Sequence, residues 1–366
     1  MGQSPPSKFY NRNGEGLFFI QGNKEFQDLY VMPEIYTSKC NKTAPENSVL
    51  ITVRAPVGNV NLTLQEICIG RGVAAIFHKD NDFLKNRFCY YILRGLEDYI
   101  MSFGEGGTTY ESITKKDLEN IQIPLPPPDE QSRIAAVLSW FDDLIENKKQ
   151  QNEILEKTAM ALFKSWFVDF EPFRDVEFVY SEELGREVPW GWEAVTLKDL
   201  TKDIFSGRGK YAIDEKEGKY PLWGANGVIG QAEKYDVDGF AILTGRVGTL
   251  GKVFLVEGKF AVSDNVLAAI PKEEWVTFYL YILMKTQIDY ESLNVGSTQP
   301  LITKTDLGNQ LSLLPPDSIL QRFHEMVEPL FRKIINNEKE IMVLKRARDA
   351  LLPLLVFGKL RVEAIE

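Results

Sequence analysis

Apolar side chains between positions 134 and 166 recur alternately four and three residues apart. Eight of the ten positions are apolar, and the two polar ones, Lys148 and Asn152, are neighbours in mid-series. This spacing is typical of a coiled-coil seam. We therefore expect one long helix that packs against another along Ile134, Leu138, Phe141, Ile145, Lys148, Asn152, Leu155, Ala159, Leu162 and Trp166.

Four prolines precede this helix, at positions 124, 126, 127 and 128. Proline fixes φ and biases the residue before it to extended backbone. The helix therefore cannot begin before Pro128. Asp129 is expected to cap its N-terminus, and the charge of Glu130 suits the helix dipole.

A second series with the same spacing lies near the C-terminus, after Pro315, Pro316 and Asp317. We expect Pro329 to kink this second helix and Pro353 to bend or end its last turn. The positions of the series are Phe323, Val327, Leu330, Ile334, Asn337, Ile341, Leu344, Arg348, Leu351 and Leu355.

The chain repeats itself at an offset of about 190 residues. Tyr-Ile-Leu at 91–93 recurs at 281–283, and Ile-Thr-Lys at 113–115 recurs at 302–304. The order is therefore domain, long helix, domain, long helix. The predicted segments are a first domain (1–128), a long helix (129–168), an acidic linker (169–186), a second domain (187–314), a second long helix (315–357) and a C-terminal tail (358–366).

The two domains combine strand and helix patterns, so the predicted fold class is α+β: two similar mixed α/β domains separated by two long helices that form an antiparallel coiled coil. In the first domain we expect a hairpin turning at 56–59, a strand at 72–77 and one helix at 83–100. The second domain opens with Trp190-Gly191-Trp192-Glu193 and a strand-like segment. Met1-Gly2 corresponds to the later Ser206-Gly207, so the first domain is expected to lack this front strand or to have it upstream.

The charge distribution changes what the domains could bind. The net charge of −10 argues against non-specific binding along a polyanion. Residues 169–200 hold 9 Asp or Glu against 3 Lys or Arg, whereas residues 1–128 hold 14 against 13. Because most of the excess lies between the domains, each domain can still present a locally basic surface.

No catalytic or metal-binding pattern stands out in the sequence. Gly245–Val253 misses the spacing of a phosphate-binding loop, and we interpret it as a hairpin turn. His78 and His324 lie in unrelated contexts, and His324 is expected on a solvated helix face. The cysteines, Cys40, Cys68 and Cys89, are irregularly spaced and are expected to be reduced thiols. We predict a chain with no catalytic residues, no metal site and no cofactor of its own.

Several stretches resemble the specificity (S) subunits of type I restriction–modification systems. They are Gly2–Ser7 (GQSPPS), Ile123–Gln131 (IPLPPPDEQ), Phe163–Phe170 (FKSWFVDF) and Pro189–Trp192 (PWGW). The resemblance extends over essentially the whole chain, and the proline-rich lead-in with its long helix occurs twice.

The sequence has no run of 18 apolar residues and no basic-then-apolar signal at its N-terminus, so we expect a cytoplasmic protein with no membrane contact. The resemblance implies a non-catalytic subunit. Each of two target-recognition domains would read one half of a split, asymmetric double-stranded DNA sequence, and the coiled coil would set the spacing. The subunit would gather two methylation subunits and then restriction subunits, which would supply the S-adenosylmethionine, ATP and Mg²⁺ chemistry. The alternative from the residues alone is a coiled-coil scaffold whose paired domains bind proteins.

DNA contacts are expected on loops that carry polar and basic side chains, because such groups contact phosphates and base edges. The N-terminal segment, the matching SGRGKY segment and the duplicated Gly-Thr-Thr and Gly-Ser-Thr loops meet this condition. The predicted DNA-binding residues are Gln3, Ser4, Lys8, Arg12, Thr108, Thr109, Arg208, Lys210, Ser297, Thr298 and Gln299.

The polar seam residues predict the register of the helix pair. Antiparallel pairing about positions 150 and 339 places Asn337 opposite Asn152, with Lys148 nearby, whereas parallel pairing would place Asn337 near Lys148. Buried polar pairs of this kind fix register. The same scheme puts Arg348 near Phe141, where its guanidinium is expected to extend to solvent rather than to pair.

Overall fold

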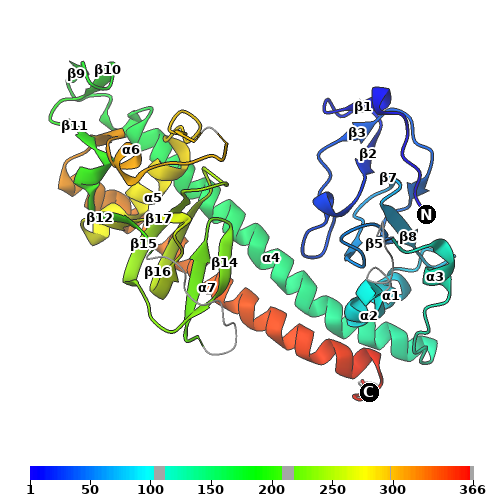
Figure 1. Ribbon diagram of the computed structural model, residues 1–366. Helices are drawn as coiled ribbons and strands as arrows, with labels where there is room; N and C mark the ends of the chain where they lie inside the picture. The colour runs from blue at the N-terminus through cyan, green and yellow to red at the C-terminus, as the bar shows by residue number, and fades with distance from the viewer. Residues whose placement is uncertain (103–111, 208–217, 297, 363–366) are drawn as a thin grey trace. The chain divides into compact units, whose positions relative to one another are not determined.

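The computed structural model describes residues 1–102, 112–207, 218–296 and 298–362, in two compact units (Figure 1). The first unit comprises Met1–Lys149 with Glu338–Glu366, and the second comprises Gln150–Asn337. Two 40-residue helices, α4 (Pro128–Phe167) and α7 (Asp317–Val356), contribute to both units. Each unit therefore holds one domain together with parts of both long helices.

Helix α4 begins at Pro128, one residue before the predicted cap. The N–H groups of Glu130 and Gln131 both donate to the carbonyl of Pro127, so Asp129 lies inside the first turn and does not cap it. Proline suits the first helical position because its missing N–H would have no partner there. In α7 the helix continues through Pro329 and ends three residues after Pro353.

The seam positions are buried or half-buried throughout both series, and none is exposed. Within the first unit Arg348 pairs with Asp142 and Lys148 with Glu340. Within the second unit the Trp166 and Phe323 rings lie 5.9 Å apart, and Asn337 Nδ2 donates to Asn152 Oδ1 at 2.8 Å. In each unit the partner number on α7 falls as the number on α4 rises, so the helices are antiparallel.

The expectation that Arg348 extends to solvent is wrong. Its side chain is 9% exposed, and Nη1 donates to Asp142 Oδ1 at 2.6 Å. Asp142 also accepts from the Tyr91 hydroxyl at 2.6 Å. The buried Asp142 carboxylate pairs with the guanidinium and so lowers the cost of burying Arg348. The apolar series did not include Asp142 because this residue lies one position away from the seam.

The first domain has two small sheets, ordered β1-β3-β2-β7-β4 and β6-β5-β8. The strands are β1 (Tyr10–Asn11), β2 (Leu17–Ile20), β3 (Tyr36–Thr37), β4 (Thr43–Ala44), β5 (Val49–Thr52), β6 (Val60–Leu62), β7 (Ile67–Ile69) and β8 (Val73–Ile76). The helices are η1 (Ser7–Phe9), η2 (Asn23–Glu25), α1 (Phe83–Gly95), α2 (Glu97–Ser102) and α3 (Lys115–Glu119). The expected hairpin is formed by the antiparallel strands β5 and β6.

Two expectations for this domain are wrong. The single helix predicted at 83–100 is two helices, α1 and α2, separated at Leu96. Gly95 ends α1, and a Cβ there would lie 3.1 Å from the Leu352 side chain, so the residue permits close packing on α7. The cysteines are not all free, because Cys40 and Cys68 form a disulfide. Pairing of Thr43 with Cys68 between β4 and β7 brings the two thiols together.

The second domain is built on a six-stranded sheet, ordered β12-β17-β15-β16-β13-β14, and α5 packs against β15 and β16. The strands of the second unit are β9 (Phe178–Ser181), β10 (Arg186–Pro189), β11 (Glu193–Thr196), β12 (Thr201–Ser206), β13 (Tyr220–Gly224), β14 (Gly227–Ala232), β15 (Val237–Gly245), β16 (Val253–Val262), β17 (Val266–Pro271) and β18 (Leu311–Leu314). Its helices besides the long pair are η3 (Glu171–Phe173), η4 (Leu197–Leu200), η5 (Glu274–Val276), α5 (Thr277–Thr286) and α6 (Lys304–Gly308).

The front strand of the second domain is β11, which pairs with β18. This pairing helps to bury Leu313, which is 4% exposed. Residues 121–127 of the first domain correspond to β18 and form no strand, and Leu125 there is 71% exposed. Among the described residues, no helix has both the length and the apolarity needed to span a membrane.

Candidate nucleic-acid interface

Three loops of the second domain meet where β15 ends. Backbone bonds join them, from Gly248 N to the Pro300 carbonyl at 2.9 Å and from Ile302 N to the Arg246 carbonyl at 2.9 Å. Asn226 Nδ2 donates to Thr249 Oγ1 at 3.2 Å, and this bond attaches the turn between β13 and β14 to the other two loops. We call the surface formed by Asn226, residues 246–249 and residues 298–300 the second-domain loop cluster.

The second-domain loop cluster exposes side chains that can recognise base edges. Asn226, Thr298 and Gln299 are exposed, and Arg246 is half-buried. Arginine pairs with guanine, and asparagine or glutamine pairs with adenine, through two hydrogen bonds each. Gly248, at φ +80°, lies so close to Gln299 that an added Cβ would be 3.3 Å from its Nε2, so the glycine leaves the amide uncovered. Sequence analysis predicted Thr298 and Gln299 but missed Asn226 and Arg246.

The N-terminal segment of the first domain is fixed by backbone bonds. Gly2 N donates to the Val73 carbonyl and Gln3 N to the Ile69 carbonyl, both at 2.9 Å. The hydroxyl of Ser4 accepts from Arg71 N at 3.2 Å. Ser4, a predicted DNA-binding residue, therefore uses its side chain to attach the N-terminal segment to the domain. Gln3 is exposed on the anchored segment, where its amide is available to a ligand.

Lys8 and Arg12 are both exposed, and Lys8 belongs to a small basic and aromatic group. The ammonium groups of Lys8 and Lys39 lie 5.2 and 5.5 Å from the centre of the Phe9 ring. The Ser38 N–H donates to the Phe9 carbonyl and brings Lys39 there from a distant part of the sequence. Two exposed cations beside the same aromatic ring favour phosphate contacts. Sequence analysis missed Lys39 because only the tertiary pairing places it beside Phe9.

The remaining predicted DNA-binding residues, Thr108, Thr109, Arg208, Lys210 and Ser297, lie outside the described residues.

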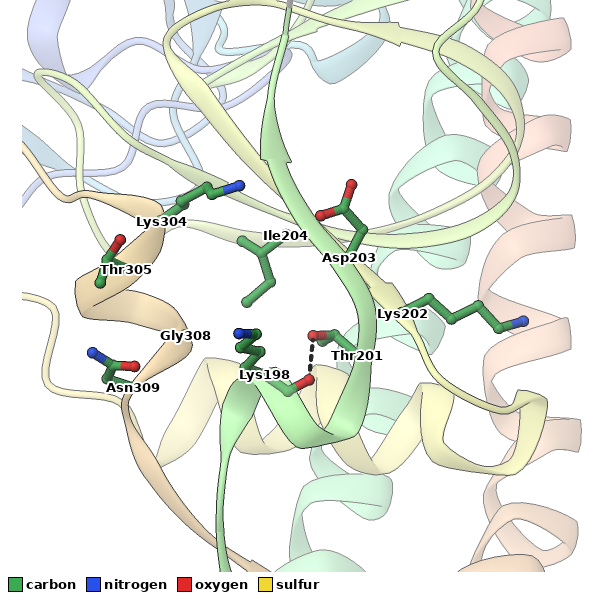
Figure 2. Close-up of a pocket in the computed structure, with 9 residues that line it drawn as sticks. All are labelled: Lys198, Thr201, Lys202, Asp203, Ile204, Lys304, Thr305, Gly308 and Asn309. Atoms are coloured by element: carbon green, nitrogen blue, oxygen red, sulfur yellow. Dashed lines mark hydrogen bonds between the residues drawn. The ribbon is translucent and has the colours of Figure 1, made fainter.

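A cavity of about 260 Å³ opens between β12 and α6 in the second domain (Figure 2). Figure 2 shows the Lys304 side chain extending toward Ile204, whereas Lys202 points away. Lys198 and Lys304 outnumber the one carboxylate in this lining, Asp203, so their ammonium groups can contact an anionic oxygen. The lining residues are Lys198, Thr201, Lys202, Asp203, Ile204, Lys304, Thr305, Gly308 and Asn309. None of the repeated motifs covers β12, so sequence repetition did not reveal this cavity.

Charged and phenolic groups attach each domain to the long helices. In the first unit, Asp28 accepts from Lys149 on α4 at 2.9 Å and from Lys345 on α7 at 2.7 Å. Burial opposes the charge of Asp28, but the bonds from Lys345 and Lys149 outweigh it and lower the pKa of Asp28 to about 2. In the second unit, Glu156 on α4 accepts from Tyr281 and Lys285 of α5.

Residues 2–157 and 189–346 each match the family described as Type I restriction modification DNA specificity domain. The chain belongs to this family. It is 37% identical, over an alignment of 387 positions, to the Type I restriction enzyme MjaIX specificity subunit of Methanocaldococcus jannaschii. The alignment covers 96% of this chain and 85% of that protein. It is also 26% identical over 333 residues to the HindI specificity subunit of Haemophilus influenzae, covering 69% and 72%.

The fold of the specificity family is also found in a solved structure. The S subunit of a type I system from M. genitalium matches with a TM-score of 0.58 at 23% identity, over 97% of this chain and 92% of that one. The duplicated match of the specificity domain confirms the predicted family and the internal repeat.

Proposed function

We propose that this chain is the DNA specificity subunit of a type I restriction–modification complex. Each specificity domain reads one half of a split double-stranded DNA target, and the antiparallel helices set the spacing between the halves. The observation that carries this proposal is the presence of two DNA specificity domains, each bonded to both long helices. In the first unit, Asp28 of the domain bonds to a lysine on each long helix. In the second unit, Glu156 on α4 and Arg332 on α7 bond to residues of the domain.

In the second domain, we assign base recognition to the second-domain loop cluster. We assign contacts with the DNA phosphates to the cavity between β12 and α6. This division follows from chemistry, because Asn226, Arg246 and Gln299 match base edges, whereas Lys198 and Lys304 offer point charges to phosphates. In the first domain, Gln3 is the base-reading candidate, and Lys8 and Arg12 are the phosphate candidates.

The catalytic steps belong to partner subunits in this proposal. Methylation and restriction subunits would hold the S-adenosylmethionine, ATP and Mg²⁺, and the assembled complex would work in the cytoplasm. On α4 of the first unit, Trp140 and Leu144 lie one turn apart and are 62% and 50% exposed. Apolar side chains of this size on one helix face fit a protein interface, and we assign them to a methylation subunit.

Methylome sequencing of the host with and without this gene tests the function directly. The proposal requires a bipartite methylated motif that disappears with the gene. An unchanged methylome, with the methylation subunits still expressed, would contradict it and favour a scaffold that binds proteins only.

Docking is tested separately by co-purification of the methylation subunit with the full chain. Trp140→Ser together with Leu144→Ser should reduce recovery of that subunit at least tenfold. The control is Leu64→Ser, at a leucine that is 62% exposed in the first domain. Equal recovery with all three chains would rule out the assigned surface and leave DNA recognition untouched.

A further inference from the structure

Three potential metal ligands meet in the second unit, and none of them belongs to the second-domain loop cluster. They are Glu274, on η5 immediately before α5, and His324 and Glu328, one helical turn apart on α7. One ligand atom from each lies within 4.8 Å of the other two. Residues four apart on a helix present their side chains on the same face, so two of the three ligands are placed by α7 alone.

The imidazole of His324 is held in place by aromatic packing. Its ring stacks on Phe278 with 4.9 Å between ring centres, and Phe278 stacks in turn on Phe331 at 4.6 Å. The side chain is 12% exposed, so the expectation of a solvated histidine is wrong. The sequence could not show this, because α5 covers this side of α7 only after the second domain has folded.

His324 and Glu328 lie at a spacing that suits an ion pair when the imidazole is protonated, and the same spacing suits two ligands of one metal ion. His324 Nε2 lies 3.6 Å from Glu328 Oε2, beyond the usual limit of about 3.2 Å for an N–H···O bond. Two ligands at roughly 2.1 Å from a tetrahedral zinc ion lie about 3.4 Å apart. His324 Nδ1 is buried and has no hydrogen-bond partner among the described residues.

A neighbouring arginine orients one of the carboxylates. Arg332 Nε donates to Glu328 Oε1 at 3.2 Å, and Arg332 also bonds Glu257 of β16. These bonds engage one oxygen of Glu328, while Oε2 faces His324. Partners outside the ligand set commonly orient ligating carboxylates in this way. The two ligating carboxylates, with Glu257 beside them, outweigh the positive charge of Arg332.

We propose that Glu274, His324 and Glu328 bind a first-row divalent cation, with Zn²⁺ as the best fit, and that the ion clamps the start of α5 to α7. One imidazole and two carboxylates form a nitrogen and oxygen ligand set that suits zinc and leaves a coordination position for water. Ala135 and Ser139 occupy the corresponding seam-aligned positions of α4. The site therefore belongs to the second specificity domain alone and is not part of the duplicated framework.

Isothermal titration of the chelator-treated full chain with Zn²⁺ tests this proposal. We expect one site per chain, with at least tenfold weaker binding in His324→Gln and in Glu274→Gln. The matched control is His78→Gln, because His78 is the only other histidine and lies 3.7 Å from one carboxylate, Asp80. Absence of that site from the wild type, or equal binding by wild type and His324→Gln, would overturn the proposal.

Thermal unfolding supplies a second measurement. Zn²⁺ should raise the Tm of the wild type and of His78→Gln, and should leave the Tm of Glu274→Gln unchanged. Glu274 is exposed, so this variant should fold even if substitution of the packed His324 disturbs α7. An equal Zn²⁺-dependent rise in Glu274→Gln would contradict its role as a ligand. Both measurements are independent of DNA binding.

Discussion

The side-chain amide of Asn337 donates a hydrogen bond to Oδ1 of Asn152 at 2.8 Å, between the two long helices. Asn337 is fully buried, and its own Oδ1 has no partner among the described residues. The flanking seam positions on α7, Ile334 and Ile341, are apolar. A polar pair within an apolar seam disfavours other registers, because any shift would leave buried amides unpaired.

Asn337→Ala should lower the free energy of unfolding by about 1 kcal/mol, because it leaves Asn152 without its donor. The double variant with Asn152→Ala should lose less than the sum of the two single losses, by about 1 kcal/mol. Chemical denaturation followed by circular dichroism measures both. Asn336→Ala, at an exposed neighbouring position, is the control. Additive losses would show that the two amides do not interact.

Arg348→Ala should be far more damaging than a typical surface change. It would leave Asp142 buried without its cation, and breaking such a pair costs about 3–5 kcal/mol. Arg346→Ala, at an exposed position of the same helix, should change stability by less than about 0.5 kcal/mol. Denaturant titration of the two variants makes the comparison. A similar midpoint for both would show that the Arg348–Asp142 pair stabilises the fold no more than an exposed side chain does.

The long helices were largely predictable, because a 4-3 apolar series depends only on local spacing. Asn152 and Asn337 appeared in that series and so revealed the register. Asp142 and His324 were misjudged or missed for one reason: both lie off the seam, on faces that a folded domain covers. Tyr91 reaches Asp142 in the first unit, and Phe278 covers His324 in the second. Sequence spacing contains no information about such contacts between distant segments.

The candidate DNA interface was predictable only where it lies on one continuous loop. Thr298 and Gln299 were found because their loop is duplicated. Arg246 and Asn226 were missed because they lie on separate turns of the sheet. The turn that carries Arg246 contacts the loop through Gly248, and Asn226 bonds to Thr249 of that same turn. A hairpin turn seen alone in the sequence does not indicate which surface it faces.

Asp28→Asn should destabilise the first unit at neutral pH and progressively less in acid. The folded pKa of Asp28 is about 2, below its ordinary value of 3.8. Its contribution is therefore fully present above pH 4 and is lost as the pH falls toward 2. Because Asp28 is half-exposed, solvent screening limits the effect to about 1 kcal/mol. Denaturant midpoints of wild type and variant, compared from pH 7 down to pH 2, should converge toward the acid end. A constant difference across this range would exclude the charge of Asp28 as its cause.

Arg246→Ala and Lys304→Ala should weaken DNA binding in different ways. Arg246 is placed to read a base, so its loss should cost about 1–3 kcal/mol on the correct target and relax specificity at one position. Lys304 offers a phosphate contact, so its loss should weaken all sequences alike and reduce the salt slope by about 1. The assay is a salt-dependent binding titration with methylation subunits present, using the cognate target and single-base variants of it.

Lys333→Ala is the control for both variants, because Lys333 is exposed on α7 outside the loop cluster and the cavity. Its affinity and salt slope should match the wild type. Uniform weakening by Arg246→Ala, with specificity intact, would move that residue from base recognition to phosphate contact. An unchanged salt slope in Lys304→Ala would remove the cavity from the DNA interface, since a lost phosphate contact must release fewer counterions.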